Sequence, residues 1–165
     1  YNGKIINLRL DEVELPDGKN SEREIVEHSG GVGVIPYQQE KVVLIKQFRK
    51  AVNRVLWEIP AGKLEPNEDI LKCGQRELRE ETGYQAEEFT KICDFYTSPG
   101  FTNEQIHLYL ATRLTKYEQN MDEGEFIETK EFSISEIRRM IDSGKINDAK
   151  TIIALQHLLI YLHMD

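Results

Sequence analysis

Apolar and polar residues alternate near the start of the chain in a way that predicts β-strands. Apolar side chains recur at nearly every second position over residues 3–15, and a second alternating run covers residues 21–28. Between the two runs, Pro16 and Gly18 favour a tight turn, because proline presets one corner and glycine accepts a positive φ. The pattern therefore predicts an N-terminal antiparallel β-hairpin over residues 1–28.

Two strongly apolar runs follow this hairpin. They cover residues 31–36 and 42–48, and residues 38–41 form the predicted turn between them. The second run is apolar enough for a strand that is buried on both faces. Shorter strands are predicted at residues 55–59, 90–97, 106–113 and 126–132.

Helical periodicity replaces alternation in the middle of the chain. Residues 68–82 contain no proline, and Gly83 stands where a glycine commonly ends a helix. The residues predicted to face the core from this helix are Ile70, Leu71, Gly74 and Leu78. A second helix is predicted to begin near Glu136, with Ser133 or Ser135 as its N-cap.

A last helix is predicted over residues 148–162. The order of strands, helix, strands and helices predicts an α/β (α+β) fold in which helices pack on a mixed sheet. The chain has 165 residues, a length that fits one domain over residues 1–165.

Charge and cysteine content narrow the class of protein. The formal net charge is −8 at pH 7, which argues against binding nucleic acid through phosphate contacts. The apolar runs are far shorter than a membrane span requires, and the first residues contain no secretory h-region. Cys73 and Cys93 suit a reducing compartment, because their spacing fits neither zinc nor a disulfide framework. We expect a cytoplasmic protein with neither nucleic acid nor membrane as a partner.

Three glutamates on the first predicted helix indicate a functional site. Glu77, Glu80 and Glu81 share one face near the helix C-terminus, where like charges repel and the macrodipole disfavours negative charge. A divalent cation would turn this repulsion into binding, and carboxylate oxygens suit Mg²⁺ or Mn²⁺. The alternative is a solvated helix face on which Arg76 and Arg79 supply the counter-charges.

The residues around these glutamates have a recognisable spacing. The specified positions are Gly62, Glu68, Arg76, Glu77, Leu78, Glu80, Glu81, Gly83 and Tyr84. This pattern resembles the Nudix box. The resemblance implies a Nudix-type α/β/α sandwich in which residues 62–84 form a loop, a helix and a loop. It also implies hydrolysis of a nucleoside diphosphate that is linked to another moiety.

The resemblance further implies two to three Mg²⁺ or Mn²⁺ ions in each site. The implied metal ligands are the carbonyl of Ala61 and the carboxylates of Glu68, Glu77, Glu80, Glu81 and Glu125. Arg76 resembles the arginine that holds the carboxylates in place, and Glu80 is either a ligand or a residue that orients water. The general base is expected on a loop after the box. Glu123 and Glu125 are its two main candidates, and Glu104 is a third.

Three features outside the box resemble the ADP-ribose pyrophosphatase branch of the family. Pro99 lies fifteen residues beyond Tyr84, a spacing that marks ADP-ribose hydrolases in that branch. Arg49 resembles the arginine that contacts the pyrophosphate in that branch. Glu58 is expected to contact either the substrate or an arginine. The hairpin resembles one that is swapped between the subunits of a homodimer. The other implied substrate contacts are Arg23, Glu24, His28, Ser98, Gly100 and Glu104.

The activity that this resemblance implies is metal-dependent hydrolysis of ADP-ribose to AMP and ribose 5-phosphate. Two alternatives stay open on the sequence. One is an enzyme that hydrolyses a GDP-sugar or another nucleotide sugar. The other is a non-catalytic domain that senses ADP-ribose.

Overall fold

The computed structural model describes residues 1–119 and 126–164. In chain order the elements are β1 (Ile6–Glu14), β2 (Asn20–His28), β3 (Gly31–Gln38), β4 (Lys41–Arg49), β5 (Arg54–Glu58), β6 (Ala61–Lys63), α1 (Ile70–Thr82), β7 (Tyr84–Tyr96), β8 (Gln105–Lys116), β9 (Glu128–Ser133), α2 (Ile134–Asp142) and α3 (Ala149–Met164).

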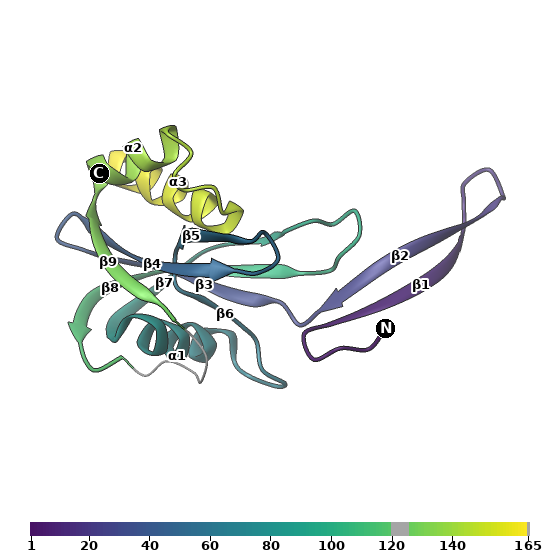
Figure 1. Cartoon of the computed structure of the whole chain (residues 1–165), viewed down its shortest axis with the longest axis horizontal. Coiled ribbons are helices and arrows are strands. Elements are labelled where there is room, and N and C mark those ends of the chain that lie inside the picture. The colour runs from purple at the N-terminus through teal and green to yellow at the C-terminus, as the bar shows by residue number, and fades with distance from the viewer. Residues whose placement is uncertain (120–125, 165) are drawn as a thin grey trace.

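One mixed sheet forms the centre of the molecule. Its main path runs β5-β4-β3-β8-β7, while β6 pairs with β3 and β9 pairs with β4. Strands β3 and β8 are parallel, with Gly31 opposite Ile106, and the other pairs in the sheet are antiparallel. In Figure 1, α2 and α3 lie on one side of the sheet and α1 lies on the other. The predicted α/β/α sandwich with a mixed sheet is confirmed.

The two faces of the sheet bury separate hydrophobic clusters. The larger cluster joins residues of the sheet to residues of α2 and α3, including Leu44, Leu108, Ile137 and Leu155. The smaller cluster packs Cys73 and Leu78 of α1 against Val32, Val34 and Ala111 of the sheet. Gly74 lets the helix approach closely, because a Cβ at this position would lie 3.0 Å from Val32. The second face therefore fixes α1, and with it the three glutamates, against β3.

The N-terminal hairpin of β1 and β2 projects from this body as an arm (Figure 1). Its register runs from Ile6 opposite His28 to Glu14 opposite Asn20. At its base the backbone of Val26 exchanges hydrogen bonds with Phe101 and Asn103, and the Asn103 side chain accepts from the His28 N–H. The predicted hairpin is confirmed, and its base is fastened to the loop between β7 and β8.

Some local predictions were wrong. Phe48 is 51% exposed, because only Val42–Ile45 of β4 lie in the buried part of the sheet. Leu71 is 36% exposed in the first turn of α1, and Cys73 takes the buried position instead. Strand β7 begins at Tyr84, since Gly83 turns the chain back directly into pairing with β8. The three-residue strand β6 was not predicted.

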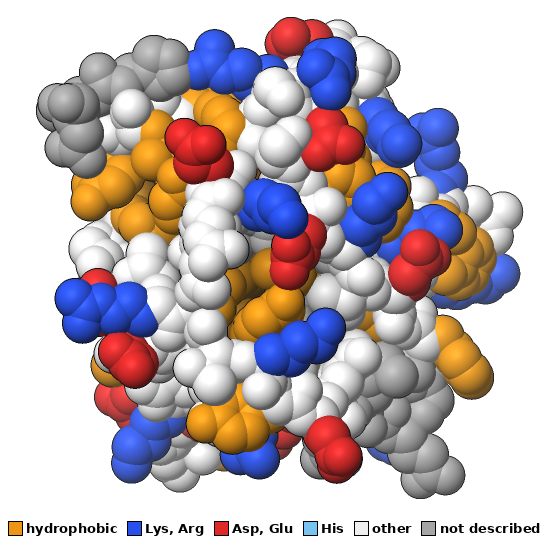
Figure 2. All heavy atoms as spheres, turned by 90° about the vertical axis from the view of Figure 1, so that its left-hand side faces the viewer, with side chains coloured by type: hydrophobic (Ala, Val, Ile, Leu, Met, Phe, Trp, Pro, Cys, Tyr) orange, Lys and Arg blue, Asp and Glu red, His pale blue; other side chains and the backbone are white. Residues whose placement is uncertain are grey.

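Charges of both signs are interspersed on the face of the molecule that points away from the arm (Figure 2). Lysine and arginine side chains lie among aspartates, glutamates and small apolar patches, so neither sign forms a continuous field on this face. None of the helices in the described ranges is long and apolar enough to cross a membrane.

Candidate functional site

Helix α1 carries the carboxylates, and its two ends are well defined. Asp69 caps the first turn, where its side chain accepts a hydrogen bond from the Lys72 N–H at 3.0 Å. Gly83 ends the helix with a φ of +71°, a left-handed conformation that favours glycine. These ends place Glu77 and Glu81 on the side of the helix that faces β6.

Glu81 connects this helix to β6. Its carboxylate accepts a hydrogen bond from the backbone N–H of Ala61 at 2.8 Å, and the residue is only 3% exposed. Burial of a carboxylate requires such partners. The contact fixes Glu81 beside the residue whose carbonyl was predicted to bind metal.

Arg76 gathers three other glutamates around one guanidinium group. Its nitrogens lie 2.9 Å from Glu68, 2.7 Å from Glu77 and 3.0 Å from Glu80. The hydrogen bonds from Arg76 lower the pKa of Glu68 to about 2, and the same bonds raise the pKa of Arg76. The guanidinium group therefore offsets much of the repulsion that these side chains would otherwise experience.

Gly62 leaves the space that the Glu77 carboxylate occupies. A Cβ built on Gly62 would lie 1.8 Å from Oε1 of Glu77, far inside van der Waals contact. Glycine is therefore required here for a close approach, while the backbone φ of this residue is an ordinary one. The strand β6 and the helix α1 meet at this contact.

Arg49 approaches the same region from the end of β4. Its guanidinium group forms a bidentate ion pair with Glu58, with both hydrogen bonds at 2.8 Å. Lys150 of α3 also donates to the Glu58 carboxylate and lies 3.0 Å from Asp148. Burial opposes ionisation of Glu58, but the hydrogen bonds from Arg49 and the charge of Lys150 outweigh it and lower its pKa.

Glu58 is only 1% exposed, and its carboxylate contacts Arg49. Contact with an arginine is one of its two predicted roles. The Arg49 side chain remains 38% exposed, so an anion in the cleft can reach it. Thr151 completes the network, because its hydroxyl donates to Asp148 and accepts from the Ile59 N–H.

Arg49, Arg76 and the glutamates of α1 line one cleft of about 540 Å³. Its lining includes Gln47 and Arg49 from β4, residues of β6 and of the loop after it, and Ile5 and His28 from the base of the arm. The residues that it shares with the predicted site are His28, Arg49, Ala61, Arg76, Glu77, Glu80 and Glu81. The cleft thus brings a cation, Arg49, to the edge of an array of carboxylates.

Other predicted site residues lie elsewhere in this chain. Arg23 and Glu24 are exposed on β2, and Arg23 contacts Ser21 and the backbone of Glu22. The residues Arg23, Glu24, Ser98, Gly100 and Glu104 do not line the cleft described above. Glu123 and Glu125 lie outside the described residues.

Glu104 occupies the loop at the base of the arm. Its carboxylate accepts from the Thr97 hydroxyl at 2.6 Å and lies 3.6 Å from Nδ1 of His28. The same His28 nitrogen accepts from the Gly30 N–H at 3.0 Å, so that the neutral ring carries its proton on Nε2. Glu104 therefore lies beside a residue of the cleft without lining the cleft itself.

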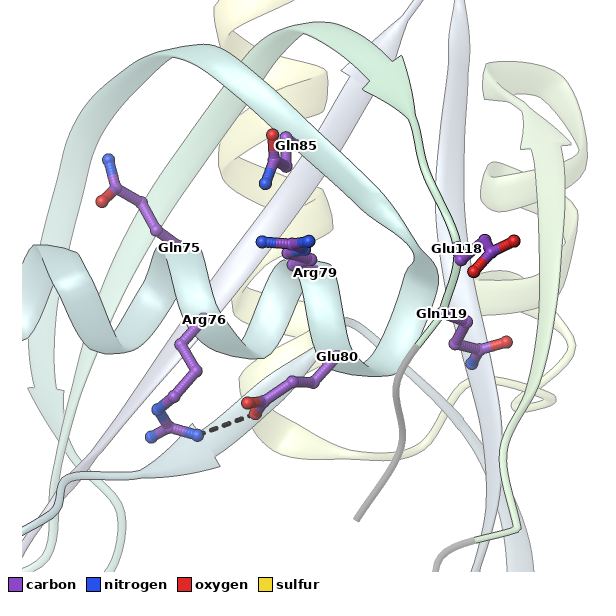
Figure 3. A pocket seen from close by; sticks show the side chains of 7 residues that line it. All are labelled: Gln75, Arg76, Arg79, Glu80, Gln85, Glu118 and Gln119. Carbon is purple, nitrogen blue, oxygen red and sulfur yellow. Dashed lines mark hydrogen bonds and ion pairs between the residues drawn. The ribbon is translucent and has the colours of Figure 1, made fainter.

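A second pocket, of about 630 Å³, lies along α1 (Figure 3). Arg76 and Glu80 point toward each other on one side of the helix, whereas Gln75 extends to the other side. The remaining lining comes from Arg79, Gln85, Glu118 and Gln119. This pocket shares Arg76 and Glu80 with the cleft.

The donor set fits a hard divalent cation. Carboxylate and carbonyl oxygens are the ligands that Mg²⁺ and Mn²⁺ prefer. Within residues 1–119 and 126–164 no three acidic, histidine or cysteine side chains already converge as a metal site. Glu68, Glu77 and Glu80 are instead turned toward Arg76.

Comparisons with known proteins identify the family. Residues 27–155 match the model of the NUDIX domain, which covers more than half of the chain. The chain belongs to the Nudix family. Residues 1–26 match a model described as the nucleoside diphosphate sugar hydrolase N-terminal domain. The resemblance inferred from the box is confirmed.

Several curated relatives are similar to this chain over most of their length. An ADP-ribose pyrophosphatase of Bacillus subtilis is 47% identical over 96% of this chain and 87% of its own. A methanol dehydrogenase activator of Bacillus methanolicus is 45% identical over the same shares. A GDP-mannose pyrophosphatase of Cronobacter sakazakii is 38% identical over 87% of this chain and 80% of its own.

A solved structure supports the Nudix fold independently. The crystal structure of an ADP compounds hydrolase superposes with a TM-score of 0.88 at 18% identity, covering 99% of this chain and 89% of that one. At this identity the likeness concerns the fold alone.

Two contributors to the candidate site were missed by sequence reasoning. Lys150 lies 92 residues after Glu58, and a lysine in the first turn of a helix carries no signal of such a partner. Gln47 stands in a segment that was noted only for its arginine. Its place on the same strand face as Arg49, two residues away, was the available signal.

Proposed function

We propose that this protein hydrolyses the pyrophosphate bond of ADP-ribose to AMP and ribose 5-phosphate, with bound divalent cations. The observation that carries this proposal is the cleft in which Arg49 meets the carboxylates of Glu77 and Glu81. An arginine suits the negative oxygens of a pyrophosphate, and carboxylates suit the cations that accompany it. The pyrophosphatase from Bacillus subtilis at 47% identity supports the choice of substrate.

The proposed roles combine the resemblance to the Nudix box with the positions of the residues that the structure describes. Glu77, Glu81 and the Ala61 carbonyl would hold Mg²⁺ or Mn²⁺, with Glu80, Glu68 and Glu125 as further ligands for two to three ions. The bound cations supply charge stabilisation and lower the pKa of a water ligand. Arg49 binds the pyrophosphate, and Glu58 with Lys150 keeps its guanidinium group oriented. Arg76 holds the glutamates in place.

The chemical step is the displacement of one phosphate by water. The water oxygen forms a bond to one phosphorus, and the bond from that phosphorus to the bridging oxygen breaks. The bridging oxygen leaves with the other phosphate group, and a glutamate accepts the proton of the water. Glu123 and Glu125 remain the predicted bases, and Glu104 remains the third candidate.

The arm is proposed to complete the site of a second subunit in a swapped homodimer. Two features support this. Strand β1 exposes apolar side chains to solvent: Ile6, Leu8 and Leu10 are 37%, 41% and 59% exposed. Contact with a second subunit would bury this apolar surface. Arg23 and Glu24 also lie outside the cleft of their own chain. We further propose that residues 1–165 form one functional domain. Its proposed location is the cytoplasm.

Hydrolysis of a GDP-sugar is a second candidate, favoured by the relative named GDP-mannose pyrophosphatase. A panel assay separates the two. ADP-ribose, ADP-glucose, GDP-mannose, NADH and ATP are incubated with Mg²⁺ or Mn²⁺, and products are resolved by chromatography. We expect ADP-ribose to lead by about tenfold or more in kcat/KM.

The other outcomes of the panel are equally informative. A lead for GDP-mannose would overturn the choice of substrate and keep the reaction class. Binding of ADP-ribose with no turnover in either metal would favour the sensor over the enzyme.

A further inference from the structure

One residue that lines the cleft, Gln47, has a buried polar atom without a partner in the part of the chain that the structure describes. Oε1 of Gln47 is buried, and no hydrogen-bond donor reaches it among residues 1–119 and 126–164. The residue lines the cleft that also holds Arg49 and the carboxylates of α1. Buried acceptors are nearly always hydrogen-bonded in folded proteins, so an exception on a residue that lines a cleft points to a ligand.

The position of Gln47 relative to Arg49 defines which part of a ligand it meets. The two residues are separated by one position on β4, so their side chains lie on the same face of the strand. Two residues of a strand span about 7 Å. A ligand whose phosphates contact Arg49 would therefore present to Gln47 the group that adjoins those phosphates.

The chemistry of the side chain identifies that group as neutral. Charged groups of the cleft, such as Arg49 and Glu81, are suited to phosphates and cations. A carboxamide has no charge, and it offers one acceptor oxygen beside a donor NH₂ group. A sugar hydroxyl, which donates and accepts at once, is complementary to this pair.

We propose that Gln47 is a specificity-determining residue that accepts a hydrogen bond from a sugar hydroxyl next to the pyrophosphate. The inference rests on the proposed hydrolysis of a nucleotide sugar and names one of its contacts. The hydroxyl belongs either to the nucleoside ribose or to the terminal sugar. A role in folding alone is disfavoured, because an unpaired buried acceptor destabilises the folded chain.

The test removes the two partners of the bond one at a time. The Gln47→Leu variant removes the carboxamide, and Gln156→Leu removes an exposed carboxamide of α3 that does not line the cleft. Each protein is assayed with ADP-ribose and with analogues that lack single hydroxyls on the adenosine ribose or on the terminal ribose. Binding of ADP-ribose is measured by calorimetry, and thermal unfolding checks the fold.

We expect the Gln47→Leu variant to lose about threefold to tenfold in kcat/KM for ADP-ribose, mainly through KM. One analogue should show a similar loss with the wild-type chain and no further loss with the variant. The sugar that carries the missing hydroxyl of this analogue is the one that Gln47 contacts. The melting temperature should stay unchanged or rise, and Gln156→Leu should behave as wild type.

Other results would overturn the inference. An equal loss for every analogue, or a changed dependence on metal concentration, would place a water or the metal region at Gln47. No loss at all in an active enzyme would leave the proposed hydrolysis intact and reject Gln47 alone. Wild-type protein that neither binds nor cleaves any nucleotide sugar would reject both.

Discussion

Lys150 and Glu58 lie 92 residues apart in the sequence and form an ion pair in the interior of the protein. The pair places the first turn of α3 behind the arginine of the cleft, since Glu58 also binds Arg49 with two hydrogen bonds. Glu58 is 1% exposed, so it depends on these two cations for its charge.

Replacement of Lys150 by methionine should therefore affect both stability and substrate binding. We expect a loss of about 2–3 kcal/mol in the free energy of unfolding, because Glu58 loses one partner while it stays buried. KM for ADP-ribose should rise more than kcat falls, since Arg49 is less firmly oriented. Urea unfolding and steady-state kinetics measure the two effects.

Two further variants serve as controls for this ion pair. Lys150→Arg should restore most of the stability, and Lys145→Met, at an exposed loop position, should change neither quantity. A Lys150→Met protein as stable and active as wild type would show that Arg49 alone suffices to hold Glu58.

Glu81→Gln should abolish most of the turnover while the protein stays folded. The glutamine still offers an oxygen to the Ala61 N–H but lacks the charge that a divalent cation requires. We expect a fall of about 100-fold or more in kcat/KM, with a change of less than about 1 kcal/mol in stability. Mg²⁺ should raise the melting temperature of wild type and not of this variant.

The exposed Glu87 supplies a matched control for Glu81. Glu87→Gln should retain activity within about twofold and keep the stabilisation by Mg²⁺. Near wild-type turnover of Glu81→Gln at saturating metal would contradict the role assigned to Glu81.

Gly62→Ala should reduce activity through Glu77. The added methyl group would occupy the place of the Glu77 carboxylate, which is the movable end of a flexible side chain. The carboxylate should shift with little effect on the fold, because the backbone of Gly62 is unstrained. We expect about a tenfold loss in kcat/KM or more, with little change in the melting temperature.

A second glycine-to-alanine variant shows whether the loss of activity is specific to Gly62 or follows from replacing any glycine. Gly144→Ala changes an exposed glycine of the loop after α2 that has open space around its Cβ and lies outside the cleft. Its φ of +69° favours glycine, so we expect a lower melting temperature for this variant and an unchanged kcat/KM. Equal losses of kcat/KM in the two variants would argue against a specific contact between Gly62 and Glu77.

The pairing of Glu68 with Arg76 predicts how stability depends on pH. The pKa of Glu68 falls from 4.5 to about 2 in the folded chain, mainly through hydrogen bonds from Arg76. A lowered pKa contributes stability that is fully present above pH 4.5 and is lost as the pH falls toward 2. Glu68→Gln should therefore show a smaller loss of stability than wild type between pH 4.5 and pH 2.

Urea unfolding at several pH values in this range measures the difference between the two proteins. Glu14→Gln, which removes an exposed carboxylate of the arm, should follow the wild-type curve. Parallel curves for wild type and Glu68→Gln would mean that the ion pair with Arg76 adds nothing to stability in solution.

Much of the fold was predictable because local signals agree with it. Gly83, the serine cap at Ser133 and the turn after Pro16 each act within a few residues of chain, and the structure contains all three. Burial was less predictable. Phe48 continues an apolar strand but extends past the covered part of the sheet, which only the packing of other elements decides.

The box residues of the site were predictable from their spacing, whereas their supporting contacts were not. Arg76 and its glutamates lie within one helix and the loop before it, so helical geometry relates them. The contacts of Lys150 and Thr151 with Glu58 and Ile59 depend on how α3 packs on the sheet. The place of Gln47 in the cleft depends on which elements lie around β4. No local pattern records that α3 begins beside Glu58.

The base of the arm is held by three hydrogen bonds to Phe101 and Asn103, on the same loop that carries Ser98 and Gly100. These hydrogen bonds join the arm to the loop, so a displacement of the arm would also displace the loop. In the proposed swapped dimer, packing of the arm on a second subunit would therefore also position the segment around Pro99 that was predicted to mark substrate choice. In a swapped dimer, dilution to monomers would then alter selectivity as well as rate.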